Sequence, residues 1–291
     1  MPEALKDAQT PDRQSTALSG DAAKKDAGPV VVFENVSITF DVKPVLDNIS
    51  FAVEPGETRI ILGPAGTGKS VLMKLANGLI CPDSGSIRIF GNEVNTMREV
   101  DLYKLRNRIG MVFQESALFD SLSVEDNIAY RLSEEGVPPG ESHKRVEEVL
   151  NFVELKQAIN KYPSELSGGM RRRVSIARAI ITNPDLILYD SPTAGLDPIT
   201  STTIIELVVK QRDTMHTTSL LITHRLQDAF TLTTHRFNAH TNHMEPIPKS
   251  EHNGIDASTK YLVLNEGKIV FDGNTEEFVH TDDPWLKEYM A

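Results

Sequence analysis

Residues 63–70 read Gly63-Pro64-Ala65-Gly66-Thr67-Gly68-Lys69-Ser70, which fits the phosphate-loop pattern G-x-x-x-x-G-K-[ST]. The pattern requires a strand before it and a helix after it. Here an apolar stretch (58–62) precedes it and a helix-forming stretch (71–77) follows it. The glycines permit backbone angles that let successive N–H groups surround phosphate oxygens, and the helix aims its positive end at the same atoms. A chance glycine-rich turn, the alternative, would not need this order. The stretch therefore predicts a site for a nucleoside triphosphate.

The last two residues of this loop carry the chemistry. Lys69 is expected to reach the β- and γ-phosphates, because its ammonium group is a flexible point charge next to them. The Ser70 hydroxyl is expected to be a ligand of Mg²⁺, which prefers oxygen donors. The loop thus predicts ATP-type nucleotide binding together with a magnesium ion.

The composition narrows the class of protein. The chain has 291 residues, and 30 Lys+Arg against 41 Asp+Glu leave a net charge of −11. An acidic chain is a poor candidate for binding nucleic acid, which usually needs a basic face. The single cysteine, Cys81, excludes a disulfide framework and suits a reducing compartment. The chain has no apolar run long enough to span a bilayer and no secretory stretch at its N-terminus. We therefore expect a cytoplasmic protein that can dock on a membrane protein.

Three regions are expected along the chain. Residues 1–28 are polar and lack apolar periodicity, so they are predicted to be a disordered tail. Residues 29–283 are predicted to form one α/β domain. Residues 284–291 are predicted to form a short amphipathic helix that packs on the core or on a partner.

Within the domain the spacing of apolar residues changes along the chain. Alternation with period two predicts an antiparallel β subdomain from three stretches, 30–33, 36–40 and 46–53, and another strand is expected at 86–90 after a turn at 82–85. Helical periodicity then predicts an α-helical subdomain at about 115–182. Short apolar strands at 186–190 and 219–224 alternate with helices, which predicts a parallel sheet.

With these features the chain resembles the ATP-binding-cassette (ABC) ATPases over residues 30–280. The family's motifs occur in order: the phosphate loop, Gln114, Leu166-Ser167-Gly168-Gly169-Met170, the strand ending at Asp190, Gly195-Leu196-Asp197, and His224. Residues 166–170 are the family signature. The resemblance implies an α/β fold with a RecA-like P-loop core on a parallel sheet, an antiparallel β subdomain and an inserted α-helical subdomain. It also implies ATP and Mg²⁺ as ligands, and ATP hydrolysis coupled to transport.

The same resemblance assigns roles within one chain. Phe40 occupies the place of an aromatic that stacks on adenine, which a π-face permits; the alternative is a plain core phenylalanine. Gln114 is similar to the glutamine that joins the Mg²⁺ shell and links the core to the helical subdomain. Asp190 is the second acidic anchor for Mg²⁺, so the implied metal set is Ser70, Gln114 and Asp190. His224 is similar to the histidine that contacts the γ-phosphate.

The signature implies a site shared by two chains. Ser167, Gly168 and Gly169 would contact the ATP of a partner subunit, aided by the positive end of the following helix. Asp197 belongs to the same nucleotide-binding set. Because one chain has one phosphate loop and one signature, a complete site needs a head-to-tail homodimer. The run Arg171–Arg173 follows on the helix and is predicted to form a solvated face.

Ser191 departs from the family pattern. The family has glutamate directly after the Asp190 equivalent, where it orients or deprotonates the attacking water. Serine has no basicity at neutral pH, and losing a general base costs about 10²–10⁴-fold in rate. Slow hydrolysis, a long-lived ATP-bound dimer or rescue by another group are the expected consequences. Glu115 is one substitute, although a surface role suits it better. A water network around Gln114 and His224 is the other alternative.

A second departure is a polar insertion at about 238–260, where the family crosses quickly from helix to strand. It holds His240, His243 and His252, which raises a metal site as an alternative. Without cysteine or a His pair at helical spacing, a polar surface loop is the preferred prediction. A final hairpin is expected around residues 265–267.

Finer features resemble the ATPases of MCE-type (Mla-like) lipid transport systems. They are the stretches 68–74, 117–122, 162–165 and 197–201. This resemblance implies phospholipid or another apolar lipid as cargo. The implied partners are a second copy of the cassette, two integral membrane permease subunits and an MCE-domain protein, with no nucleic acid. The permease groove is expected near residues 114–120, and the protein at the cytoplasmic face of the inner membrane, as a peripheral subunit.

Two other functions compete with this one. The chain could be the ATPase of a solute importer, which the genes beside it would reveal. It could instead be an ATP-dependent binding switch that barely hydrolyses, for which Ser191 is the supporting feature. An ABC protein of DNA repair or translation is disfavoured, because those types usually carry two cassettes or long coiled-coil insertions.

Overall fold

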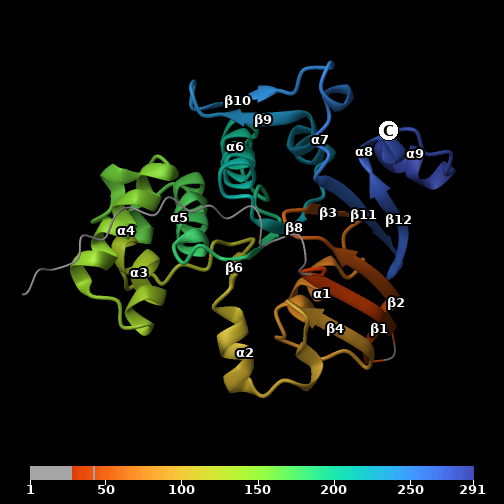
Figure 1. The fold of residues 1–291 in the computed structure, drawn as a ribbon, viewed down its shortest axis with the longest axis horizontal. Helices are drawn as coiled ribbons and strands as arrows, with labels where there is room; N and C mark the ends of the chain where they lie inside the picture. The colour runs from red at the N-terminus through yellow and green to blue at the C-terminus, as the bar shows by residue number, and fades with distance from the viewer. Residues whose placement is uncertain (1–27, 42) are drawn as a thin grey trace, which may run out of the picture.

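The computed structural model describes residues 28–41 and 43–291, so the tail predicted for residues 1–28 lies almost entirely outside the described residues. In the described residues, three sheets and a group of helices make up the fold (Figure 1). The strands are β1 (Val31–Phe40), β2 (Lys43–Val53), β3 (Thr58–Leu62), β4 (Ser84–Ile89), β5 (Asn92–Glu93), β6 (Ile109–Val112), β7 (Leu186–Asp190), β8 (Thr218–Ile222), β9 (His235–Asn238), β10 (His243–Pro246), β11 (Thr259–Asn265) and β12 (Lys268–Asn274). The α-helices are α1 (Lys69–Ala76), α2 (Glu99–Arg106), α3 (Val124–Glu134), α4 (Pro139–Phe152), α5 (Gly168–Ile180), α6 (Pro198–Met215), α7 (Leu226–Thr234), α8 (Thr275–Val279) and α9 (Pro284–Met290).

A six-stranded sheet in the order β12-β11-β3-β8-β7-β6 forms the core. Its neighbours from β11 to β6 are parallel, and only β12 is antiparallel, paired with β11 in the predicted final hairpin. Strands β3 and β8 are buried at every position, which explains why they read as continuous apolar runs. The predicted α/β fold with a parallel core sheet is confirmed.

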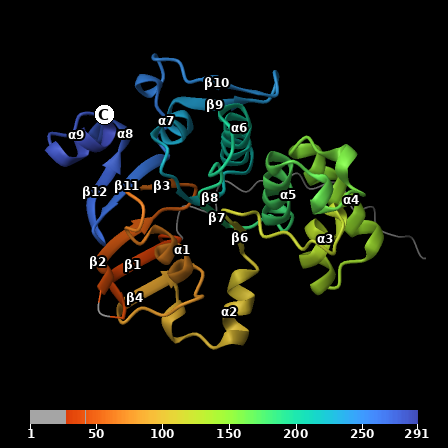
Figure 2. The ribbon, with the colours of Figure 1, turned by 180° about the vertical axis from the view of Figure 1, so that it is seen from behind.

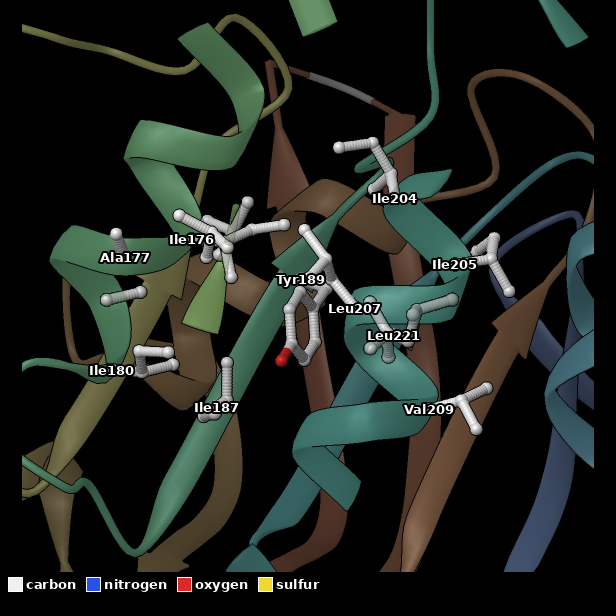
Figure 3. Close-up of a cluster of buried hydrophobic side chains, with 14 of the residues drawn as sticks. Ile176, Ala177, Ile180, Ile187, Tyr189, Ile204, Ile205, Leu207, Val209 and Leu221 are labelled. Carbon is white, nitrogen blue, oxygen red and sulfur yellow. The ribbon is translucent and has the colours of Figure 1, made fainter. Parts of the chain in front are cut away.

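Each face of the core sheet packs into its own hydrophobic cluster, because alternate residues of a strand point to opposite faces. Ile60 and Tyr189 belong to the cluster that α5, α6 and α7 share. Ile61 and Leu188 belong to the other cluster, which includes the antiparallel sheet and α1. Figure 3 shows Tyr189 among side chains of α5 and α6.

The antiparallel sheet has the order β2-β1-β4-β5. Two strands were predicted at 30–33 and 36–40, but the structure has a single strand, β1. The register with β2 shifts between Phe33 and Val36, and Asn35 between them has φ of +51°. The polar pair Glu34-Asn35 that suggested a turn is therefore a β-bulge inside one strand.

Helices α3 and α4 lie at the opposite end of the molecule from α8 and α9 (Figures 1 and 2). Ser123 is the N-cap of helix α3, and its Oγ accepts a hydrogen bond from Asp126 N at 3.0 Å. Asn127 is fully buried, and its amide bonds the backbone of Phe119 in both directions. This contact ties the segment before α3 to the helix itself.

The polar insertion folds into a hairpin rather than a plain loop. Strands β9 and β10 pair antiparallel from His243↔Asn238 to Pro246↔His235. Met244 packs on the core cluster, which explains why the hairpin lies over α6. Across residues 28–41 and 43–291, no group of three or more His, Cys, Asp or Glu side chains is placed to hold a metal ion. In the same residues, none of the helices has the length and apolar character needed to cross a bilayer.

Candidate functional site

The phosphate loop connects β3 to α1, and two of its glycines leave no space for a side chain. A Cβ at Gly63, where φ is +142°, would lie 2.1 Å from the Leu264 carbonyl oxygen. A Cβ at Gly68, where φ is +95°, would lie 2.6 Å from Leu46 Cδ2. Gly66 has φ of +78° and open space around it. The loop therefore keeps its backbone exposed and curled, as a phosphate cradle requires.

Lys69 lies inside this curl. Its Nζ donates to the carbonyl oxygens of Gly63 at 2.8 Å and Pro64 at 2.6 Å, and lies 3.4 Å from Thr67 Oγ1. Burial lowers the pKa of Lys69, and the negative charge of Asp190 acts in the opposite direction. The cation is thus held within the loop and close enough to Asp190 to be affected by its charge.

The proposed magnesium donors lie at or beyond the carboxyl ends of three strands of the core sheet, β3, β6 and β7. Ser70 is exposed in the first turn of α1, Asp190 ends β7 half-buried, and Gln114 is exposed just after β6. Carboxyl ends of parallel strands share one edge, which is where ligands bind in open α/β sheets. Hydroxyl, carboxylate and amide oxygens are hard donors that suit Mg²⁺, so this set fits the ion. His224 is exposed at the same edge, two residues after β8.

Ser191 is buried beside Asp190. Its φ is +48°, its N–H donates to the Ile222 carbonyl at 3.0 Å, and its Oγ donates to Asp190 Oδ1 at 3.3 Å. The hydroxyl thus supports the carboxylate of Asp190 and supplies no base. Glu115 is exposed, as its surface alternative expected.

The signature loop begins helix α5. Ser167 is its N-cap, with Oγ accepting from Met170 N at 3.3 Å. Ser167 and Gly168 are exposed, whereas a Cβ at Gly169 would lie 2.4 Å from Thr200 Cγ2. The N-terminal end of α5 is therefore open to a second molecule, and its close packing on α6 requires glycine.

Asp197 caps helix α6 in a similar way. Its Oδ1 accepts from Ile199 N at 3.1 Å and Thr200 N at 3.0 Å, and Thr200 Oγ1 donates to Oδ2. These hydrogen bonds, led by that of the Thr200 hydroxyl, lower the pKa of Asp197. Asp197 is exposed, and the neighbouring Ile199 is 81% exposed.

The prediction that residues 171–173 form a solvated face is wrong for Arg172. Its side chain is buried, with Nη1 donating to the Phe113 carbonyl and Nη2 to the Ala194 carbonyl at 3.4 Å. Arg172 thus joins residues 113–117, here called the Gln114 segment, to the segment before Asp197. The reason is helical spacing: position 172 lies four residues before Ile176, which faces the core.

Arg178 was not predicted and holds the other side of the Gln114 segment. Its Nη1 donates to the Ala117 carbonyl at 2.8 Å and its Nη2 to the Ser116 carbonyl at 3.0 Å. Ser116 and Ala117 both have positive φ, so the segment turns sharply there. The signal that could have indicated this role is an arginine placed among the apolar residues of a predicted helix.

Phe40 lies at the end of β1 and is 47% exposed. Its ring is therefore not part of the core, contrary to the alternative considered for it. An exposed aromatic face is what stacking on a base requires.

Comparison with known proteins identifies relatives of this chain. A profile described as ABC transporter matches residues 46–194. The ATP-binding protein MlaF of the intermembrane phospholipid transport system of Escherichia coli is 33% identical over 262 residues, which cover 90% of this chain and 88% of MlaF. The methionine import ATP-binding protein MetN 2 of Bacillus cereus is 42% identical over 201 residues, which cover 68% of this chain. The chain spans only 59% of the length of MetN 2.

A solved structure is similar over nearly its whole length. It is the dimeric post-hydrolysis state of the ATP-binding cassette MJ0796 bound to ADP and Pi, with a TM-score of 0.70 and 28% identity. The similarity covers 84% of this chain and 98% of that cassette.

Proposed function

Because this chain belongs to the ABC transporter family, whose cassettes bind ATP with Mg²⁺ and hydrolyse it, we propose that it is the motor subunit of a phospholipid transporter. The single observation that carries the lipid assignment is the share of both chains over which this protein and MlaF are similar. Similarity to the phospholipid-system protein MlaF extends over 90% of this chain and 88% of MlaF, including regions outside the core motifs.

The phosphate loop and the residues near it supply the groups that nucleotide binding needs. The loop of residues 63–70 offers N–H groups to the phosphates, and Lys69 can exchange its loop carbonyls for phosphate oxygens. Ser70, Gln114 and Asp190 would hold Mg²⁺, which neutralises charge on the phosphates. His224 would contact the terminal phosphate, and Phe40 would stack on adenine.

A second copy of the chain would complete each site. The exposed Ser167 and Gly168 lie at the N-terminal end of α5, where N–H groups and the helix dipole attract phosphate. A dimeric relative bound to ADP and Pi supports this arrangement. Two nucleotides between two chains would close the dimer, and their hydrolysis would reopen it.

Permease subunits would dock beside the Gln114 segment. A hollow of about 300 Å³ lies there, lined among others by Met111, Phe113, Phe119 and Tyr130. Phe119 and Tyr130 are 45% and 46% exposed, and their ring centroids are 5.0 Å apart. An exposed aromatic patch of this kind marks a protein interface. The subunit would then lie at the cytoplasmic face of the inner membrane, with an MCE-domain protein as a further partner.

A methionine importer is the second candidate. The importer ATPase MetN 2 has the higher identity, 42%, although the similarity covers 59% of its length. Cassettes of both kinds share the nucleotide site, so that site does not separate the two functions.

The test is transport by the assembled complex. The chain is co-expressed with the permease and MCE-type proteins encoded beside it, and the complex is reconstituted into vesicles. We expect ATP-dependent transfer of a fluorescent phospholipid that is abolished by Lys69→Met, and no uptake of radiolabelled methionine. ATP-dependent methionine uptake without lipid transfer would refute the lipid assignment.

A further inference from the structure

The C-terminal helix α9 reaches the phosphate loop. Tyr289 Oη accepts a hydrogen bond from the N–H of Gly63 at 3.1 Å, although the two residues are 226 positions apart. Figures 1 and 2 show α8 and α9 beside the edge of the core sheet formed by β11 and β12. Strand β11 pairs with β3, whose end leads directly into Gly63.

Tyr289 is held in this position by the packing of its helix. Asp283 caps α9, with Oδ1 accepting from Leu286 N at 3.0 Å. Leu286 is 1% exposed, and the rings of Trp285 and Tyr289 stack with centroids 5.4 Å apart and 7° between their planes. The hydroxyl therefore approaches Gly63 on a rigid support. Burial raises the pKa of Tyr289, so it remains a neutral phenol at physiological pH.

Gly63 is the point where the strand becomes the loop. Its φ of +142° and the 2.1 Å clash of a Cβ with Leu264 O restrict the position to glycine, which leaves the backbone free to rotate. Its carbonyl accepts from Lys69 Nζ at 2.8 Å, and its N–H is bound by Tyr289. Both polar groups of the residue are thus fixed by side chains, one inside the loop and one from the C-terminus.

We propose that Tyr289 is a positioning residue for nucleotide binding, which holds Gly63 so that the phosphate loop keeps its binding conformation. A protein whose competent state is only partly populated binds its ligand more weakly by that fraction. Loss of one neutral hydrogen bond would lower the population of the ordered loop, which corresponds to about two- to tenfold weaker ATP binding. The effect concerns affinity only, because Tyr289 contacts the loop through Gly63 and not through Lys69 or Ser70. It is independent of the cargo and of the role of Ser191.

Tyr289→Phe tests this proposal, since it removes the hydroxyl and keeps the ring that stacks on Trp285. Tyr103→Phe is the matched control, because it removes a hydroxyl from an exposed tyrosine on α2. Equilibrium binding of a fluorescent ATP analogue to the full chain gives the affinity without relying on turnover. Hydrogen exchange of peptides that contain Gly63, measured without nucleotide, reports the order of the loop.

We expect Tyr289→Phe to weaken ATP binding about two- to tenfold, to raise KM by the same factor and to leave kcat within about twofold. Exchange at Gly63 should be faster, thermal stability nearly unchanged, and Tyr103→Phe like the wild type. Unchanged affinity and exchange in Tyr289→Phe would overturn the proposal. So would a variant that loses kcat or thermal stability without weaker binding, because the hydroxyl would then have a general structural role.

Discussion

Replacing Ser191 by glutamate should convert a slow ATPase into a fast one. Ser191 already has φ of +48°, so Ser191→Glu adds no new requirement for a left-handed backbone. Its position directly after Asp190, at the carboxyl end of β7, is where a base can act on water. A well-placed general base contributes about 10²–10⁴-fold in rate, which is about 3–5 kcal/mol of barrier. We expect kcat to rise within that range.

The substitution also has a cost in stability. Ser191 is 8% exposed, and its hydroxyl supports the carboxylate of Asp190. A glutamate there loses this bond and adds a like charge, which together cost about 1–3 kcal/mol of unfolding free energy. Mg²⁺ and nucleotide should recover part of the loss by binding the folded state.

The assay is steady-state ATP turnover by the purified complex with its permease, for the wild type, Ser191→Glu and Ser191→Gln. Glutamine matches glutamate in size and cannot accept a proton at neutral pH, so only glutamate should raise kcat. Equal gains from both would indicate positioning of water rather than basicity. Ordinary turnover by the wild type with no gain from Ser191→Glu would refute the reasoning, and a water network around Gln114 and His224 would then be the better account.

Three further substitutions test the site and the core. Lys69→Met should weaken ATP binding about 10- to 100-fold by losing charge-assisted bonds, whereas Lys74→Met, exposed on the same helix, should bind normally in equilibrium titration. Arg172→Met should lower the unfolding free energy in urea by about 1–3 kcal/mol, and the 82% exposed Arg98 should tolerate methionine within about 0.5 kcal/mol. Tyr189→Phe should raise that free energy by about 1 kcal/mol, because the fully buried hydroxyl has no partner among the described residues. These expectations would be contradicted if Lys74→Met weakened ATP binding as much as Lys69→Met, or if Arg98→Met lowered the unfolding free energy as much as Arg172→Met. A loss of stability in Tyr189→Phe would contradict the third.

The parts of the fold that follow from local pattern were predictable. The stretches 58–62 and 186–190 coincide with β3 and β7, because strands buried on both faces need an unbroken apolar run. The phosphate loop was equally clear, since glycine at 63 and 68 is required by close backbone contacts and leaves a readable spacing. Both signals lie within a few consecutive residues.

The parts of the fold that depend on contacts between distant residues could not be predicted from the sequence. The hairpin at residues 235–246 has three histidines and one proline on a polar background, and its order comes from packing on α6. Arg172 looks like one of three charges in a row, and its burial is decided by the segments on either side of it. The contact of Tyr289 with Gly63 joins the C-terminal helix to a loop 226 positions earlier in the chain. No local pattern records such a pairing.

Helix α5 connects the signature residues to the Gln114 segment. Its N-cap is the exposed signature residue Ser167, and along its length Arg172 and Arg178 bind carbonyls on both sides of Gln114. A helix is stiff over this distance, so the contact proposed between its N-terminal end and a partner's nucleotide would, if it displaced that end, move both guanidinium groups. Phe113 and Ala117 line the hollow proposed for the permease, and Gln114 between them would supply a donor for Mg²⁺. Nucleotide contacts at one end of α5 and permease contacts along its side would therefore both act on the segment 113–117, in which the carbonyls of Phe113, Ser116 and Ala117 are bound by the two arginines.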